Sequence, residues 1–194
     1  MPHAVSALLV GEIGAGKTTV CQRLAEALRR RGLPLGGIIS QPRYDGQGRK
    51  RELYAVDLWS GQCRRLATVG AQAASDGPPA GLAQGPYVFD PATFAWAVQA
   101  VRVSLAHSPA LVIVDEIGPL ELEAQAGLAP LLGGALGACP TLLVVRRAWQ
   151  AALEARLGVR PLVFEVLPAT RDRLPEMIIA ALCPRSFAFS NHLG

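Results

Sequence analysis

Residues 11–19 read GEIGAGKTT, and this stretch decides the fold. It matches the pattern G-x-x-x-x-G-K-[ST], in which a glycine-rich loop surrounds phosphate groups. An apolar run, AVSALLV at residues 4–10, precedes it, and from Lys17 to Arg31 the apolar residues keep helical spacing. Strand, loop and helix follow each other in the order that the motif requires. The stretch therefore predicts an α/β protein with a phosphate-binding loop.

Each part of this loop has a physical reason to bind phosphate. Glycines allow crowded backbone conformations in which N–H groups converge on phosphate oxygens, and the helix N-terminus adds partial positive charge. We expect Lys17 to reach the β- and γ-phosphates of a nucleoside triphosphate, and the Thr18 hydroxyl to bind Mg²⁺. The Glu12 side chain should point away from the phosphates. The predicted nucleotide-binding loop residues are Gly11, Glu12, Ile13, Gly14, Ala15, Gly16, Lys17, Thr18 and Thr19.

The basic residues are unevenly divided between two types. Only two of the 19 are lysines, Lys17 and Lys50. A compact ammonium group fits between phosphates where a planar guanidinium does not, so the lysine in the loop supports the assignment. The net charge is +4, but the other basic residues form short clusters without interleaved aromatic side chains. We therefore do not expect specific nucleic-acid binding.

The composition fits one domain, residues 1–194. The chain is 51% hydrophobic and 18% charged, which is enough apolar material for a sizeable core. No apolar run approaches the ~20 residues of a membrane helix, and the N-terminus lacks a basic leader, so we expect no membrane contact and a cytoplasmic location. The four cysteines show no CxxC spacing, which argues against a zinc site or disulfides.

Apolar runs and helical patterns alternate along the chain. Strands are predicted at 4–10, 35–40, 111–115, 141–145 and 163–166, and helices at 17–31, 91–108, 128–136, 148–157 and 171–182, with Asp90 as an N-cap. The pattern predicts a three-layer P-loop fold with a mostly parallel sheet of about five strands between helices. A β-hairpin insertion is predicted at about 43–66, and a mobile loop at about 70–86.

Residues 111–116, LVIVDE, end a predicted strand with two acids. We expect Asp115, at the end of a strand neighbouring the first one, to hold Mg²⁺ through water. Because side chains alternate along a strand, Glu116 should point elsewhere and orient or deprotonate a water molecule; the alternative is a merely exposed strand end. Glu121 and Glu123 are interpreted as solvated or capping residues. No N-K-x-D motif follows the fourth strand, which argues against a switch GTPase.

Several blocks in order resemble the THEP-type nucleoside-triphosphatase family, also called cancer-related nucleoside triphosphatase. They are GEIGAGKTT, GGIISQPR, GRKRELYAVDLWSGQCRRLA, GPYVFDPATF, VDEIGPLEL and FEVLPATRDRLPEMI, and together they cover nearly the whole chain. Leu167 and Thr170 stand where the family often has Thr and Asn. The resemblance implies a P-loop fold and slow, Mg²⁺-dependent hydrolysis of nucleoside triphosphates such as ATP and GTP, with broad base tolerance.

Arginines near the γ-phosphate usually assist phosphoryl transfer. Arg146, after the fourth strand, is predicted to contact the γ-phosphate, and with Lys17 and Glu116 it completes the predicted catalytic set. Arg171, in the terminal block, is predicted to contact the base or ribose; the alternative is a salt bridge at a helix start. The hairpin arginines, such as Arg43 and Arg49, either bind a second substrate or a protein partner, or form a solvated face.

Two further functions remain open from the sequence. One is a nucleotide or small-molecule kinase, with the 43–65 region as its lid. The other is an interaction protein in which slow hydrolysis resets binding to a partner. A hydrolase releases phosphate from a nucleoside triphosphate and Mg²⁺ alone, whereas a kinase needs an acceptor, so acceptor dependence separates the two enzymes.

Overall fold

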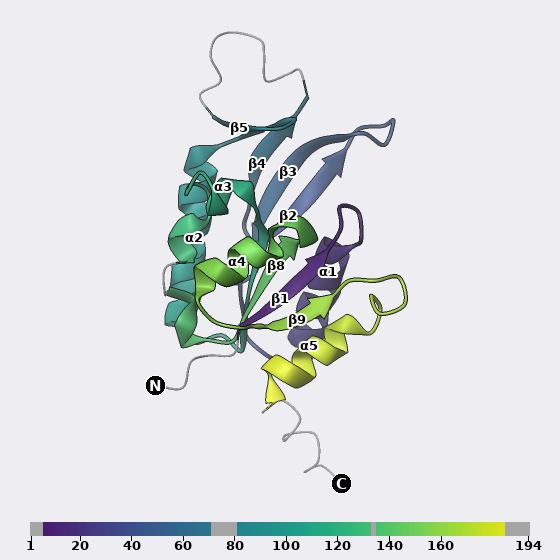
Figure 1. The fold of residues 1–194 in the computed structure, drawn as a ribbon, viewed down its shortest axis with the longest axis vertical. Coiled ribbons are helices and arrows are strands. Elements are labelled where there is room, and N and C mark those ends of the chain that lie inside the picture. Colours follow the sequence, from purple (N-terminus) through teal and green to yellow (C-terminus); the bar gives the residue numbers. More distant parts are fainter. Residues whose placement is uncertain (1–5, 71–80, 133–134, 185–194) are drawn as a thin grey trace.

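The computed structural model describes residues 6–70, 81–132 and 135–184, and within them nine strands form one mixed sheet (Figure 1). The strand order is β5-β6-β4-β3-β2-β7-β8-β1-β9. The strands are β1 (Ser6–Gly11), β2 (Leu35–Tyr44), β3 (Lys50–Asp57), β4 (Cys63–Val69), β5 (Leu82–Gln84), β6 (Tyr87–Phe89), β7 (Leu111–Ile117), β8 (Thr141–Arg146) and β9 (Leu162–Glu165).

The five strands predicted from the sequence form the parallel part of the sheet, β2-β7-β8-β1-β9. The predicted number of about five strands is nevertheless too low. The region predicted as a hairpin insertion contains two successive antiparallel turns, so that β3 pairs with β2 and β4 pairs with β3. Strands β6 and β5 continue the same sheet beyond β4. These three strands, β2, β3 and β4, form a meander that widens the central sheet. The alternating sequence pattern of the region alone did not indicate this.

Helices cover both faces of the sheet. They are α1 (Lys17–Arg30), α2 (Pro91–Ala106), α3 (Pro119–Leu122), α4 (Gln150–Leu157) and α5 (Leu174–Leu182). Helices α1 and α5 pack on one face, and α2 packs on the other (Figure 1). Strand β1 serves both faces, because Leu8 and Val10 enter one apolar cluster and Ala7 and Leu9 the other. This is the predicted three-layer arrangement.

Three predicted helices differ from the structure. The segment predicted as a helix at 128–136 contains two short 3₁₀ turns, Ala129–Leu131 and Ala135–Ala138, because its glycines and Pro130 disfavour a longer helix. A 3₁₀ turn, Arg147–Trp149, precedes α4. Helix α5 begins at Leu174, three residues later than predicted, with Pro175 in its first turn. Helix α2 begins as predicted, because Asp90 accepts hydrogen bonds from the N–H groups of Ala92 and Thr93.

Strands β2 and β7 approach each other closely at Gly37. This residue has φ +105°, and a Cβ atom there would lie 1.9 Å from the carbonyl oxygen of Ile113. Only glycine fits such a backbone, since a side chain would collide with the neighbouring strand. The close pairing brings the next part of β2, including Ser40, alongside the carboxyl end of β7.

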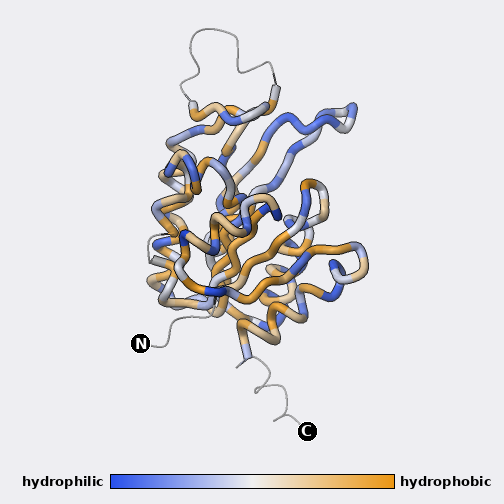
Figure 2. Tube along the Cα trace, in the orientation of Figure 1, coloured by the Kyte–Doolittle hydropathy of each residue, from blue (hydrophilic) through white to orange (hydrophobic). Residues whose placement is uncertain are grey.

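Hydropathy follows this architecture (Figure 2). The parallel strands are hydrophobic, whereas the turn between β2 and β3 is hydrophilic. The predicted mobile loop at about 70–86 falls largely on 71–80, outside the described residues, and its last part contains β5. Among the helices that the structure describes, none is long and apolar enough to cross a membrane. The cytoplasmic location stays a prediction.

Candidate nucleotide-binding site

The loop GEIGAGKTT connects β1 to α1 at the carboxyl end of the parallel strands. Gly14 (φ +79°) and Gly16 (φ +96°) adopt left-handed conformations that let the chain turn sharply before the helix. Gly16 is the N-cap of α1 and has no side chain to accept a hydrogen bond from the first helical N–H groups. The first N–H groups of α1 therefore have no side-chain acceptor at the N-cap, which suits an anion.

The Lys17 ammonium group lies across the loop. It donates hydrogen bonds to the carbonyl oxygens of Gly11 (2.7 Å) and Glu12 (2.8 Å). Partial burial lowers the pKa of Lys17, and the nearby carboxyl groups of Glu116 and Asp115 oppose this change. A lysine held in this way provides a positive charge beside the free N–H groups of α1.

Asp115 is almost fully buried at the end of β7, with 2% of its surface exposed. Its carboxylate accepts hydrogen bonds from the N–H groups of Ser40 (3.2 Å) and Glu116 (2.9 Å) and from the Thr18 hydroxyl (3.4 Å). Burial, and secondly the charge of Glu116, raise the pKa of Asp115. The three elements β2, β7 and α1 therefore converge on one carboxyl group.

A β-bulge separates the two acids. Strands β7 and β8 pair regularly up to Val114 and Leu143, but the next pair is Ile117 with Val145, so Asp115 and Glu116 together face one residue of β8. Glu116 has φ +70°, which is unusual for a residue other than glycine. As a result Asp115 is buried beside Thr18, and Glu116 is exposed. The predicted divergence of these side chains is present, with a bulge as its cause.

Strand β7 is not the direct neighbour of β1, which corrects the sequence-based expectation. Strand β8 lies between them and ends at Arg146, which pairs in register with Gly11. An arginine is thereby placed at the same level as the start of the loop. Its positive charge is close enough to lower the pKa of Lys17 further.

These residues surround a cavity of about 430 Å³. Of the predicted site residues, Ile13, Gly14, Gly16, Lys17, Thr18, Thr19, Asp115, Glu116 and Arg146 line it. Gly11, Glu12, Ala15 and Arg171 are not among the lining residues. Gly11 and Glu12 contribute carbonyl groups that hold Lys17, while the Glu12 carboxylate lies 3.7 Å from the guanidinium of Arg147. Arg147 also forms an ion pair with Glu165 at the end of β9.

The cavity also contains a residue that the sequence did not assign to it. Lys50, the second of the two lysines, lines the cavity from the start of β3. Its ammonium group lies 3.4 Å from the hydroxyl oxygen of Tyr87 and 5.8 Å from the centre of that ring. The available signal was the rarity of lysine in an arginine-rich chain. Its position depends on the turn between β2 and β3, which pairs Lys50 with Tyr44, another residue that lines the cavity.

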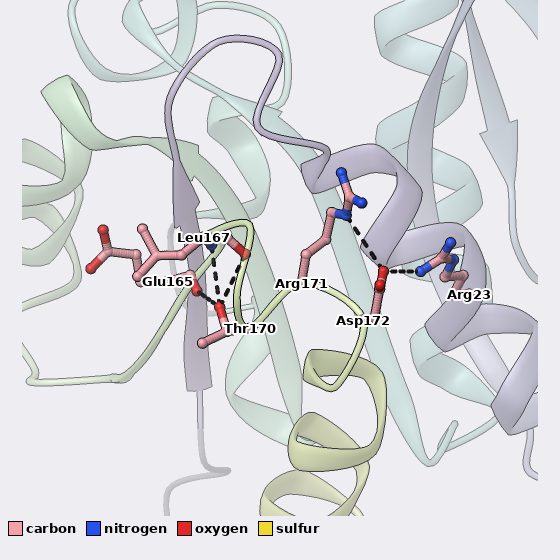
Figure 3. A network of polar contacts seen from close by, with 6 residues as sticks. All are labelled: Arg23, Glu165, Leu167, Thr170, Arg171 and Asp172. Carbon is pink, nitrogen blue, oxygen red and sulfur yellow. Dashed lines mark hydrogen bonds and ion pairs between the residues drawn. The ribbon is translucent and has the colours of Figure 1, made fainter.

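Arg171 lies in the loop before α5, beside the phosphate-binding loop (Figure 3). A Cβ atom on Gly16 would be 3.0 Å from its Cδ atom, so the arginine stem packs against the loop. Its guanidinium is 3.5 Å from Asp172, which in turn pairs with Arg23 of α1. The Thr170 hydroxyl donates to the Glu165 carbonyl (3.0 Å) and accepts from the Leu167 N–H (3.2 Å), which fixes this turn. The ion pair with Asp172 matches the salt-bridge alternative, and a contact of Arg171 with the base or ribose stays a prediction.

Glu121 is a capping residue, as one of the two interpretations predicted, but it is not solvated. Only 2% of its surface is exposed, and its carboxylate accepts hydrogen bonds from the N–H groups of Gly118 (3.0 Å) and Leu128 (3.1 Å). Burial raises its pKa to about 7. Glu123, two residues later, is exposed. The difference arises because Leu128 and its neighbours fold back over Glu121, a contact that no local pattern reveals.

Parallel strands flanked by helices, with this glycine-rich loop after β1, define the P-loop NTPase class of α/β proteins. A family model described as NTPase matches residues 6–179. The chain belongs to this NTPase family, and its relatives bear out the resemblance to the THEP1 type.

Two curated relatives are nucleoside-triphosphatases THEP1, from Methanopyrus kandleri and Pyrococcus abyssi. Both are 36% identical to this chain, the first over 65% of it and the second over 62%. The matched region spans 63% of the length of each relative. The solution structure of a human cancer-related nucleoside triphosphatase matches with a TM-score of 0.65 and 26% identity, over 92% of this chain and 97% of that one. THEP1 from Aquifex aeolicus shares the fold, with a TM-score of 0.63, 18% identity, and coverage of 91% and 98%.

Proposed function

We propose that this protein hydrolyses nucleoside triphosphates to the diphosphate and phosphate, with Mg²⁺ and with little preference for the base. One observation carries the proposal. The Thr18 hydroxyl touches the buried Asp115 carboxylate at 3.4 Å, while the adjacent Glu116 is exposed and lines the same cavity. A metal-holding pair and a free carboxylate are then side by side, as hydrolysis requires.

The donor set fits Mg²⁺. Thr18 and Asp115 offer oxygen atoms, which this ion prefers, and Mg²⁺ usually takes further ligands from water and substrate phosphates. In the part of the chain that the structure describes, no group of three or more His, Cys, Asp or Glu side chains is placed to hold a metal ion. Binding of the ion should therefore depend on the nucleotide. Once bound, Mg²⁺ would neutralise part of the negative charge on the phosphates.

The residues of this chain divide the reaction between them. Glu116 orients a water molecule and accepts its proton as the water oxygen forms a bond to the γ-phosphorus. The bond from that phosphorus to the bridging oxygen of the β-phosphate breaks, and the diphosphate leaves with the electron pair. Lys17, Arg146 and Lys50 provide positive charge around the transferring group. The relatives are named as nucleoside-triphosphatases with no base specified, which supports broad base tolerance.

Arg171 is proposed to contact the ribose or base. It lies against Gly16 and outside the lining of the phosphate cavity, which favours a role next to the phosphates over one on the γ-phosphate. The Asp172 carboxylate restrains its guanidinium.

The turn between β2 and β3 is proposed as the surface for a protein partner. Tyr44 lines the nucleotide cavity and is 60% exposed, so it would sense the nucleotide and a partner together. Capture of the same partner with a non-hydrolysable triphosphate and with the diphosphate tests this. Equal capture in both states would argue against nucleotide control.

The hydrolase proposal is tested by phosphate release from ATP, GTP, CTP and UTP, with and without Mg²⁺ and with no acceptor added. We expect release from all four, loss of release without Mg²⁺, and loss in Lys17→Ala. Absence of release from the wild-type protein under these conditions would rule out hydrolysis as its activity.

A further inference from the structure

A second cavity, of about 160 Å³, lies against the nucleotide cavity. The two share Tyr87, Asp115, Glu116, Ile117 and Arg146. The bulge of β7 forms the common wall, and the second cavity extends from it towards α2 and the meander strands. Nothing in the hydrolysis of a nucleoside triphosphate by water requires this space.

The walls of the second cavity are mostly apolar. They include Leu53 of β3, Leu66 of β4, Phe89 of β6, Phe94 and Ala97 of α2, and Leu120. Polar groups gather at the shared wall, where Glu116 and Arg146 are found. The cavity therefore has an apolar body and a polar end at the wall that it shares with the nucleotide cavity.

Size and charge restrict the class of ligand. An engineered apolar cavity of about 150 Å³ binds benzene, so this space fits a molecule of roughly that size. Asp115, Glu116 and Glu121 bring three carboxyl groups to the cavity against the single guanidinium of Arg146. An anionic ligand, such as a nucleoside monophosphate, would find only one cationic side chain, Arg146, among the lining residues that the structure describes. An uncharged molecule with a hydroxyl group matches both the walls and the polar end.

We propose that this cavity binds a small uncharged alcohol with an apolar body, whose hydroxyl group lies at Glu116 in place of the attacking water. This rests on the proposed function, since it uses the same nucleotide and the same base. Glu116 accepts the hydroxyl proton as the alcohol oxygen bonds to the γ-phosphorus, and the bond to the bridging β-phosphate oxygen breaks. The products are a phosphate monoester and the nucleoside diphosphate.

The test uses benzyl alcohol with the full chain, Mg²⁺ and ATP or a non-hydrolysable ATP analogue. With the analogue, benzyl alcohol should raise the Tm of the wild-type protein, because a ligand of the folded state stabilises it. With ATP, phosphorus NMR should detect benzyl phosphate. Ala97→Leu fills the cavity from α2, and its unfolding transition shows whether it is folded. Ala55→Val, from β3, is a second filling variant.

The matched control is Ala95→Leu, on the exposed side of α2. The proposal expects the Tm increase and benzyl phosphate with the wild type and Ala95→Leu, and loss of both in the filled variants. It is overturned if the wild type gives no Tm increase or no benzyl phosphate, or if Ala97→Leu and Ala55→Val respond like the wild type. Phosphate release without alcohol reports on hydrolysis alone, so a hydrolase that forms no benzyl phosphate refutes only the alcohol site.

Discussion

Glu121 should make the stability of this protein depend on pH above the usual range for carboxyl groups. Its side chain is buried, and its pKa is raised from 4.5 to about 7 in the folded protein, chiefly by burial. The folded state therefore holds a proton that the unfolded state has already released between these two values. The contribution of Glu121 to the free energy of unfolding is fully present below about pH 4.5 and is lost as the pH rises through about 7.

The magnitude follows from the two pKa values. They differ by about 2.5, and each pH unit corresponds to about 1.36 kcal/mol, so the free energy of unfolding should fall by about 3 kcal/mol. Glu121→Gln removes the titration. Its amide NH₂ faces one of the two N–H donors, from Gly118 and Leu128, so it also loses a hydrogen bond at every pH. That loss is constant and does not affect the pH dependence of the difference.

The assay is urea unfolding followed by tryptophan fluorescence, at several pH values from about 4.5 to about 8.5. Glu121→Gln should be less stable than the wild type at the acidic end. The free energy of unfolding of the wild type minus that of the variant should fall by about 3 kcal/mol towards the alkaline end, so that the variant becomes as stable as the wild type or more stable. Asp115 is present in both proteins, so its contribution to the pH dependence is the same in both and cancels in the difference between them. Glu123→Gln, which changes an exposed neighbour, should run parallel to the wild type. A constant difference between Glu121→Gln and wild type across this range would show that Glu121 does not titrate as described.

Three further substitutions test the site and the sheet. Glu116→Gln should keep nucleotide affinity but lower phosphate release roughly 100-fold or more, since it removes the base; unchanged release would dismiss that role. Lys50→Ala should lower turnover by roughly 100-fold, as expected for losing a charge at the γ-phosphate, whereas Arg51→Ala, on an exposed ion pair, should match the wild type in the same assay. Gly37→Ala should cost more than about 3 kcal/mol or prevent folding, while Gly48→Ala, with open space around it, should cost about 1 kcal/mol in urea unfolding; similar losses would argue against the close β2–β7 approach.

Local signals predicted much of the fold. Apolar runs predicted the parallel strands, and Asp90 with Pro91 correctly predicted the start of α2. The phosphate-binding loop and the Asp115 end of β7 were also readable, because each depends on residues close together in the sequence. Their meeting at Thr18 then follows from the parallel topology, which brings strand ends to one edge.

Features that depend on distant pairing could not be read in this way. Strand β8 lies between β1 and β7 in the sheet, and the order of strands in a sheet cannot be predicted from the apolar runs that form them. Lys50 reaches the cavity only because the antiparallel turn between β2 and β3 pairs it with Tyr44, which also lines the cavity. Glu121 is buried by a segment that follows it, so the sequence could suggest a solvated or capping residue but not this burial.

The bulge in β7 makes the number of residues, and not only their identity, part of this site. Two residues occupy the space of one between Val114 and Ile117. Deleting either acid would let the strand pair regularly with β8, with Ile117 still opposite Val145 and still on the same face as Val114. The deletion would instead remove the divergence of the two acids, by which Asp115 is buried beside Thr18 and Glu116 is exposed. Relatives that use this arrangement should accordingly keep the length of this segment as well as its two acids, and a single-residue deletion should lower phosphate release at least as much as Glu116→Gln.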